Sequence, residues 1–169
     1  MKILRLLIIS LVILFSVITA LSLLIPSTVR ISRAIDLNVK KEIAMKFIAD
    51  PSNWHVLFSA DSLPIIIESG KPIGIQMPGN KSILLAGITD SSVLAVPGMT
   101  NKKTIGKTTI TWTCLPGKNN EQSVVQWYMD FKLNWYPWEK FSSLLFETNY
   151  GAYMEKGLQK MKEHLEQQP

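Results

Sequence analysis

A period-two alternation near the C-terminal end places the strongest constraint on how this chain can fold. From Val125 to Trp135, apolar or aromatic side chains occupy every second position, and polar side chains occupy most of the positions between them. Successive side chains of a strand point to opposite faces, so the pattern predicts a strand with one buried and one solvated face. Such a strand is typical of an antiparallel sheet that another element covers.

Shorter strand-like runs precede this segment and extend the predicted sheet. The first run, Thr28–Leu37, alternates and carries Arg33 on its apolar face. We expect Arg33 to lie at the sheet edge, to extend its charge towards water, or to pair with a carboxylate. Turn signals rich in Gly, Pro, Asn and Asp separate the later runs. The predicted strands are 28–37, 64–68, 72–77, 82–89, 92–96, 105–115 and 125–135.

The covering element is predicted from helical periodicity. Two short helices are expected after the first strand, one over Lys40–Asp50 and one that Pro51 opens. A long amphipathic helix is expected over Pro137–Glu166, with one apolar stripe for the sheet. Gly151 and Gly157 each cost about 1 kcal/mol relative to Ala in a helix interior. They therefore indicate a close approach to the sheet or a bend, which we expect near Gly151.

The N-terminal region is predicted to cross a membrane. Leu6–Ile25 contains no charged residue. A helix of about 20 residues spans about 30 Å of hydrocarbon. Secretory signals have a shorter apolar region of about 7–15 residues, followed by a small-x-small motif. Ile18 stands two positions before Ala20, which is a poor cleavage site, so we expect an anchor that is not cleaved.

This anchor divides the predicted chain into two parts. Residues 1–27 form the single-pass transmembrane segment, and residues 28–169 form one folded domain. Positive charges flank the span on both sides and nearly balance. A basic tail before an apolar run is the usual export signal, so we expect an inside N-terminus and an extracytoplasmic domain.

Composition excludes several classes of function. The formal net charge is +5, without a dense Lys/Arg block, so no nucleic-acid partner is expected. Cys114 is the only cysteine, which excludes an intramolecular disulfide and multi-cysteine metal sites. His55 and His164 lie in separate predicted elements, so no metal site is expected. Neither a phosphate-binding Gly-rich loop nor a Ser-His-Asp signature is present, and we expect no cofactor.

Two segments of the chain resemble the START-like superfamily, also called the polyketide-cyclase/lipid-transport or SRPBCC superfamily, in a membrane-anchored bacterial form. That family's first strand is typically followed by a helix that ends in Asp, with a Trp a few residues later. Here the strand contains Val29–Asp36, the helix ends at Asp50, and Trp54 follows, in the run Phe47-Ile-Ala-Asp-Pro-Ser-Asn-Trp54. Tyr150–Leu165 looks like the family's last helix. The chain departs from the family at Leu57-Phe58, where a second Trp is common.

The resemblance implies an α+β helix-grip fold, with a curved antiparallel sheet of about six or seven strands around the long C-terminal helix. A cavity between sheet and helix would hold a hydrophobic small molecule or lipid. Aromatic side chains on the inner face, including Trp135, either line this cavity or fill the core. The residues expected to bind the ligand are Trp112, Trp127, Met129, Phe131, Phe141, Leu145, Thr148 and Ala152.

Two alternatives to simple ligand binding remain at this stage. An enzyme of the cyclase or hydrolase type would need a carboxylate, His or Tyr with a perturbed pKa inside the cavity. No catalytic residue is assigned from the sequence. A non-catalytic protein-interaction module would instead show an exposed apolar patch of several hundred Å².

Overall fold

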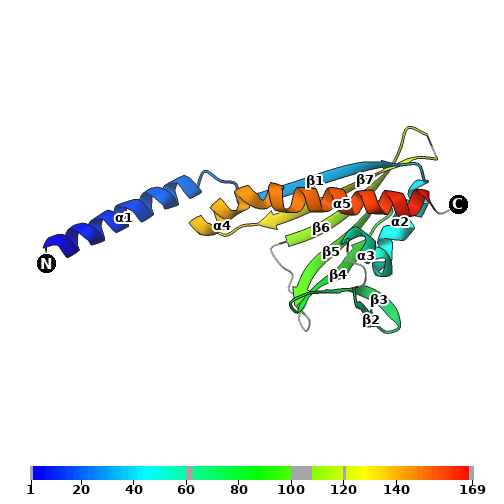
Figure 1. Ribbon diagram of the computed structural model, residues 1–169, viewed down its shortest axis with the longest axis horizontal. Coiled ribbons are helices and arrows are strands. Elements are labelled where there is room, and N and C mark those ends of the chain that lie inside the picture. The colour runs from blue at the N-terminus through cyan, green and yellow to red at the C-terminus, as the bar shows by residue number, and fades with distance from the viewer. Residues whose placement is uncertain (1, 60–62, 100–107, 120, 168–169) are drawn as a thin grey trace.

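The structure is a computed structural model that describes residues 2–59, 63–99, 108–119 and 121–167. An exposed N-terminal helix leads into an α+β domain in which a long C-terminal helix lies along an antiparallel sheet (Figure 1). The elements in chain order are α1 (Lys2–Ser22), β1 (Thr28–Leu37), α2 (Lys41–Ala49), η1 (Pro51–Asn53), α3 (Trp54–Leu57), β2 (Ile65–Glu68), β3 (Lys71–Met77), β4 (Lys81–Ile88), β5 (Ser92–Met99), β6 (Thr108–Pro116), β7 (Ser123–Lys132), α4 (Pro137–Ser142), η2 (Ser143–Leu145) and α5 (Phe146–Glu166).

The N-terminal helix α1 projects away from the domain (Figure 1). Its mean hydropathy reaches 2.7 over an 18-residue window, none of which is buried. By length and composition, α1 is therefore able to cross a membrane. The helix starts at Lys2 and ends at Ser22, and the predicted span Leu6–Ile25 continues past it into a turn before Pro26.

The seven strands form one antiparallel sheet in the order β1-β7-β6-β5-β4-β3-β2. The predicted strands are confirmed, with changed ends. β5 continues through Pro97 and Gly98, which were expected in a loop, and residues 105–107 of the predicted sixth strand lie outside the described residues. The prediction that Trp135 continues the last strand is wrong. β7 ends at Lys132 because its partner β1 begins only at Thr28, opposite that residue.

The alternation of β6 and β7 places one aromatic and apolar face against the helices. In the paired register, Trp112 lies opposite Trp127, and Ile110 lies opposite Met129. The ring of Trp54 lies 5.3 Å from that of Trp112, which lies 5.5 Å from that of Trp127. Buried aromatic pairs contribute about 0.5–1.5 kcal/mol beyond the area that they bury. These tryptophans therefore form the centre of the core.

The long helix α5 packs on this face without a bend at Gly151. The chain is instead interrupted earlier, at the 3₁₀ turn Ser143–Leu145, so the expected break near Gly151 is wrong. The alternative reading of the glycines, a close approach, is confirmed. A Cβ at Gly157 would lie 2.8 Å from the Trp127 ring and would overlap the carbonyl oxygen of Leu57. The buried residues of α5 are Gly151, Met154, Gly157, Leu158, Met161 and Leu165.

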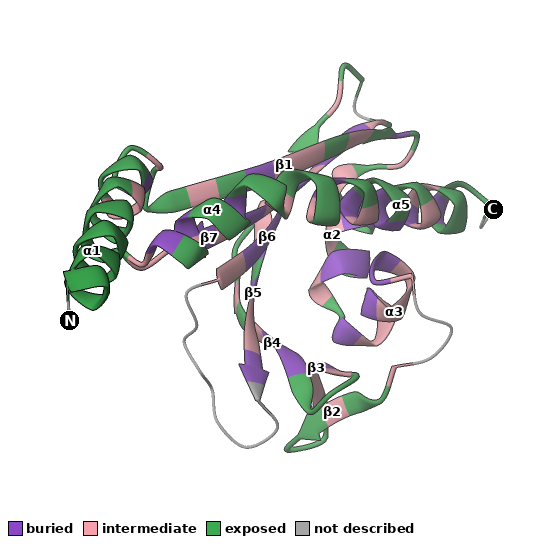
Figure 2. Ribbon diagram, turned by 60° about the vertical axis from the view of Figure 1, so that its left-hand side comes forward, coloured by how far each residue is buried: buried purple, intermediate pink, exposed green. Residues whose placement is uncertain are grey.

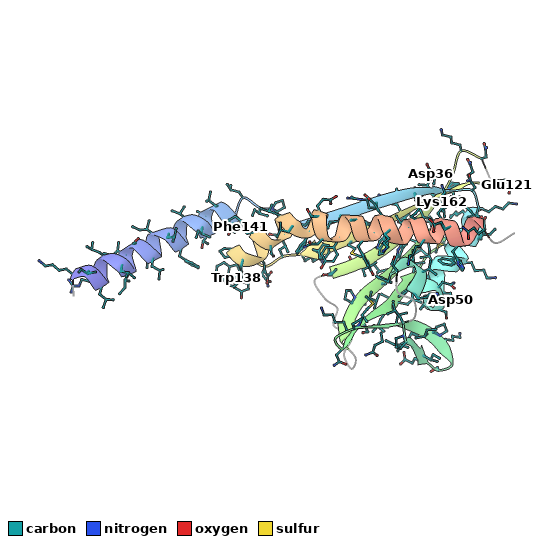
Figure 3. The ribbon with its side chains drawn as sticks, in the orientation of Figure 1. Asp36, Asp50, Glu121, Trp138, Phe141 and Lys162 are labelled. Carbon is teal, nitrogen blue, oxygen red and sulfur yellow. The ribbon has the colours of Figure 1, made fainter. Side chains whose placement is uncertain are left out.

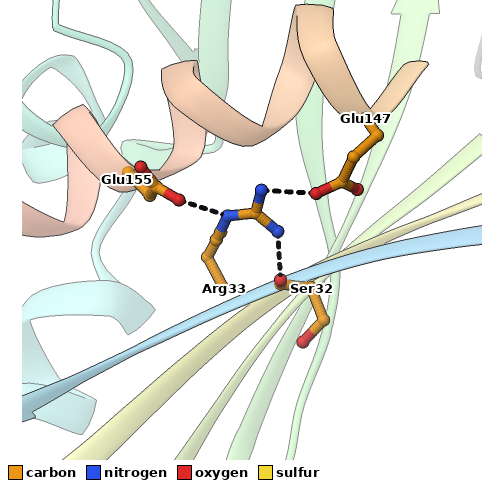
Figure 4. Close-up of polar contacts among 4 residues, drawn as sticks. All are labelled: Ser32, Arg33, Glu147 and Glu155. Atoms are coloured by element: carbon orange, nitrogen blue, oxygen red, sulfur yellow. Dashed lines mark hydrogen bonds and ion pairs between the residues drawn. The ribbon is translucent and has the colours of Figure 1, made fainter. Parts of the chain in front are cut away.

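Arg33 ties α5 to the edge strand β1 (Figure 4). Its Nε donates to Glu155 at 2.6 Å, its Nη2 donates to Glu147, and its Nη1 donates to the carbonyl oxygen of Ser32 at 2.8 Å. The expectation of a carboxylate partner is confirmed. The hydrogen bonds that Arg33 donates, first to Glu147 and then to Glu155, raise its pKa above the usual value. Both carboxylates are well exposed, so the cluster orients α5 more than it stabilises the fold.

Candidate ligand-binding cavity

A pocket of about 610 Å³ that is open to solvent lies between the inner face of the sheet and α5, and we call it the cavity. Sites for small molecules typically have volumes of about 300–1,000 Å³ and walls that are mostly apolar. Strands β3 to β7, the residue after α3, and the first half of α5 all contribute to its wall. The lining residues are Phe58, Met77, Lys81, Ile83, Pro97, Thr108, Ile110, Met129, Phe131, Asn149, Tyr150 and Tyr153.

A change in side-chain size along α5 explains why the cavity forms. At Gly157 the helix backbone contacts Trp127 directly, because no side chain intervenes. One and two turns earlier, Tyr153 and Tyr150 stand between the helix and the sheet. The Tyr150 ring lies 5.0 Å from that of Phe131, at the end of β7. These larger side chains account for the space that remains between the first half of α5 and the sheet, and this space is the cavity.

The structure divides the predicted ligand-binding residues into three groups. Met129 and Phe131 line the cavity. Trp112 and Trp127 are fully buried and lie in the core beside it, where Phe58 packs edge-on against Trp127 with a centroid distance of 5.6 Å. The remaining four predicted residues lie outside the lining and are exposed on α4, η2 and α5: Phe141, Leu145, Thr148 and Ala152.

Sequence reasoning missed most of the lining. Ile83 and Pro97 lie opposite each other on the consecutive strands β4 and β5. The strands themselves were predicted, but the sequence does not show how far along their inner face α5 extends. Tyr150 and Tyr153 were recognisable in principle. They lie beside Gly151 and Met154, which belong to the one stripe of α5 that stays apolar to its C-terminal end.

The polar chemistry of the cavity is sparse. Tyr153 donates its hydroxyl to the carbonyl oxygen of Phe58 at 2.9 Å. Burial raises the pKa of Tyr153 to about 12, which moves it away from neutrality. The lining residues that the structure describes include no carboxylate, imidazole or thiol. Tyr153 thus satisfies the enzyme alternative in having a perturbed pKa, but its proton is held more tightly than usual and its hydroxyl already has an acceptor.

The pKa of Tyr153 leads to a prediction for alkaline pH. The unfolded chain loses the phenolic proton near pH 10.0, whereas the folded protein keeps it to about 12. The contribution of Tyr153 to stability is therefore fully present below the lower value and is lost progressively as the pH rises between the two. Tyr153→Phe has no proton to lose, so its free energy of unfolding should fall less steeply over this range. At pH 8 the variant should be about 1 kcal/mol less stable, because its hydrogen bond is lost.

Urea denaturation followed by circular dichroism at pH 8, 10 and 11 measures both effects. Identical losses for the wild type and Tyr153→Phe between pH 10 and 11 would contradict the assignment of this proton to Tyr153.

The other reactive side chains lie away from the cavity. His55 Nδ1 is 2.7 Å from the carbonyl oxygen of Ser52, and the His164 ring packs 5.3 Å from that of Phe47. Cys114 is buried in β6, and burial raises the pKa of its thiol. Among the residues that the structure describes, no group of His, Cys, Asp and Glu side chains is arranged to hold a metal ion.

An antiparallel sheet that curves around a long C-terminal helix, with a cavity between the two, defines the START-like helix-grip fold. Among solved structures, the chain is similar to a START superfamily protein from Mycobacterium smegmatis, with a TM-score of 0.58 and 11% identity over 80% of this chain and 98% of that one. A protein from Nitrosospira multiformis gives a TM-score of 0.59 and 11% identity, over 81% of this chain and 96% of that one.

The Aha1 dimer from Colwellia psychrerythraea is also similar, with a TM-score of 0.52 and 14% identity over 82% of this chain and 97% of that one. No protein-family model matches the chain, and no curated protein is significantly similar to it. At these levels of identity, the similarity shows the fold alone.

Proposed function

We propose that this protein is a membrane-anchored domain that binds a hydrophobic small molecule or lipid between the sheet and α5. The observation that carries the proposal is the cavity of about 610 Å³ with a mainly apolar and aromatic wall. Burial of apolar surface contributes about 25 cal/mol per Å². A ligand that buries about 300 Å² of apolar surface would therefore gain about 7.5 kcal/mol, before the entropic cost of binding is subtracted.

Two further features support this function. The START-like fold suggests a ligand-binding domain in general, and Met129 and Phe131 would supply apolar contacts from β7. Helix α1 supports attachment to a membrane, because it is long, apolar and exposed. In this proposal, residues 1–27 form a single-pass anchor and residues 28–169 form the binding domain on the extracytoplasmic side.

A pair of neighbouring substitutions on β6 tests the proposal. Thr108 lines the cavity opposite Phe131, whereas Thr109, opposite Asp130, faces the other side of the sheet. Thr108→Trp should fill the space that the ligand needs, and Thr109→Trp adds the same bulk outside it. We expect apolar molecules that copurify with the wild type and with Thr109→Trp to be absent from Thr108→Trp.

The measurement is mass spectrometry of organic extracts from the three full-length proteins, purified in the same detergent. Lipids that merely surround α1 appear in all three extracts and cancel in the comparison. The proposal fails if the three extracts contain the same species in equal amounts while circular dichroism shows that all three proteins are folded.

A further inference from the structure

The segment between β7 and α5 presents an unusual exposed surface, which we call the α4 patch. It consists of Trp135, Trp138, Phe141, Leu144 and Leu145. Trp138 is 63% exposed and Leu144 is 64% exposed, and the other members are exposed as well. Large apolar side chains gathered in one exposed place mark an interaction site, because isolated surface hydrophobics do not cluster in this way.

The patch is uncharged because the charges within its segment are turned inward. Glu139 accepts hydrogen bonds from the backbone N–H of Asn134 at 2.7 Å and from its Nδ2 at 2.8 Å. Lys140 is only 2% exposed. Glu139 and Lys140 are the only charged residues between Leu133 and Phe146. The surface can therefore enter an apolar medium without carrying an exposed charge with it.

Lys140 also fixes where the patch lies. Its Nζ donates to the carbonyl oxygen of Ile25 at 2.8 Å and to Ser27 Oγ at 2.9 Å, directly after α1. Figure 3 shows Trp138 and Phe141 at the end of the domain nearest α1, whereas the labelled charged residues Asp36, Asp50, Glu121 and Lys162 lie towards the opposite end. Figure 2 also places α4, which is partly exposed, on the side of the domain towards α1. The patch is thus held at the point where α1 meets the domain.

The aromatic members of the segment contact one another. Tyr136 stacks on Trp138 with a centroid distance of 4.8 Å and an interplanar angle of 8°, and the Trp135 ring lies 4.9 Å from that of Tyr136 at a tilt of 40°. Trp and Tyr are enriched at the boundary between lipid and water, where an amphipathic ring fits the headgroup layer. Short amphipathic segments with exposed Trp, Phe and Leu lie in the same layer.

We propose that the α4 patch docks on the interfacial layer of the lipid bilayer that α1 enters. This inference rests on the membrane anchor in the proposed function, because α1 is what brings the patch to the bilayer. Docking would also bring the cavity to the membrane surface. The chain runs from the patch directly into Phe146, whose ring lies 4.7 Å from that of Phe131 in the cavity wall.

The distribution of tryptophans allows a direct test in proteoliposomes. Trp54, Trp112 and Trp127 are fully buried in the domain, whereas Trp135 and Trp138 belong to the patch. The full-length chain is reconstituted in vesicles of brominated phosphatidylcholine, whose bromine atoms quench only tryptophans within the bilayer. Flotation on a density gradient measures membrane attachment separately.

We expect brominated lipid to quench part of the tryptophan fluorescence of the wild type. This quenching should vanish in the double variant Trp135→Phe/Trp138→Phe. In the double variant Leu144→Lys/Leu145→Lys, which changes only exposed side chains, quenching by the lipid should weaken and quenching by aqueous iodide should increase, while the chain still floats.

Each other outcome overturns a defined part of the inference. If the chain floats and only iodide quenches Trp135 and Trp138, the patch faces water or serves a protein partner, and docking is refuted while the anchor stands. If lipid quenching persists in the tryptophan double variant, the signal does not come from the patch, and docking is again refuted. If the chain does not float, the membrane anchor itself fails. Ligand binding remains separately tested by Thr108→Trp.

Discussion

Replacement of Trp127 by Ala should lower the free energy of unfolding by about 3–5 kcal/mol, as expected for removal of a fully buried Trp. Trp127 is inaccessible to solvent and lies between Trp112, Phe58 and the backbone of α5 at Gly157. Its removal would leave a hole at the closest contact between sheet and helix. Urea denaturation of the full-length chain, followed by circular dichroism, measures the loss.

Two controls separate this effect from a general loss of the strand. Tyr128→Ala removes a neighbouring ring on the outer face, where Arg30 lies 4.6 Å from its centroid, and should cost only about 1 kcal/mol. Trp127→Phe keeps an aromatic ring and removes an indole N–H that has no partner among the described residues, so it should cost clearly less than Trp127→Ala. Equal losses for Trp127→Ala and Tyr128→Ala would show that Trp127 is not the centre of the core.

Gly157→Ala should destabilise the protein by about 1–3 kcal/mol, although Ala is the better helix former by about 1 kcal/mol. The added Cβ would overlap the carbonyl oxygen of Leu57 and press on the Trp127 ring. A backbone oxygen cannot move away by a rotamer change, so α5 itself would have to shift.

Gly87→Ala is the matched control, since a Cβ there would have no neighbour within 4 Å. The same denaturation experiment should show little change for this variant. A Gly157→Ala protein that is as stable as the wild type, or more stable, would refute the close approach of α5 and with it the explanation for the cavity.

The sheet could be predicted from sequence because its signal is local. The inner positions of β7 are buried under the helices and the outer positions are not, so apolar and polar residues alternate along the strand itself. The pairing of Arg33 was foreseeable for a similar reason, since a cation on an apolar face needs a partner. The end of β7 was not foreseeable. It depends on where β1 begins, about a hundred residues away, and this is why Trp135 was assigned to the sheet although it is exposed.

The candidate site was harder to predict than the fold. The stripe Phe141, Leu145, Thr148 and Ala152 is apolar at first, but the same spacing next reaches Glu155, which pairs with Arg33. The 3₁₀ turn before α5 shifts the phase of the helix, and a single stripe drawn through both parts therefore fails. The cavity wall from β3 to β5 depends on which part of the inner sheet face α5 covers and on the spacing between sheet and helix, which are properties of the whole fold.

Photo-crosslinking tests most directly whether the cavity holds an apolar ligand. The full-length chain in lipid vesicles is exposed to a fatty acid that carries a diazirine in its tail, irradiated and mapped by peptide mass spectrometry. Labelling of α1 serves as the internal control for contact with the bilayer. We predict additional labels on cavity residues such as Met129, Phe131 and Tyr150, and the loss of these labels in Thr108→Trp but not in Thr109→Trp. Labels confined to α1 and the α4 patch, with none in the cavity, would contradict ligand binding between the sheet and α5.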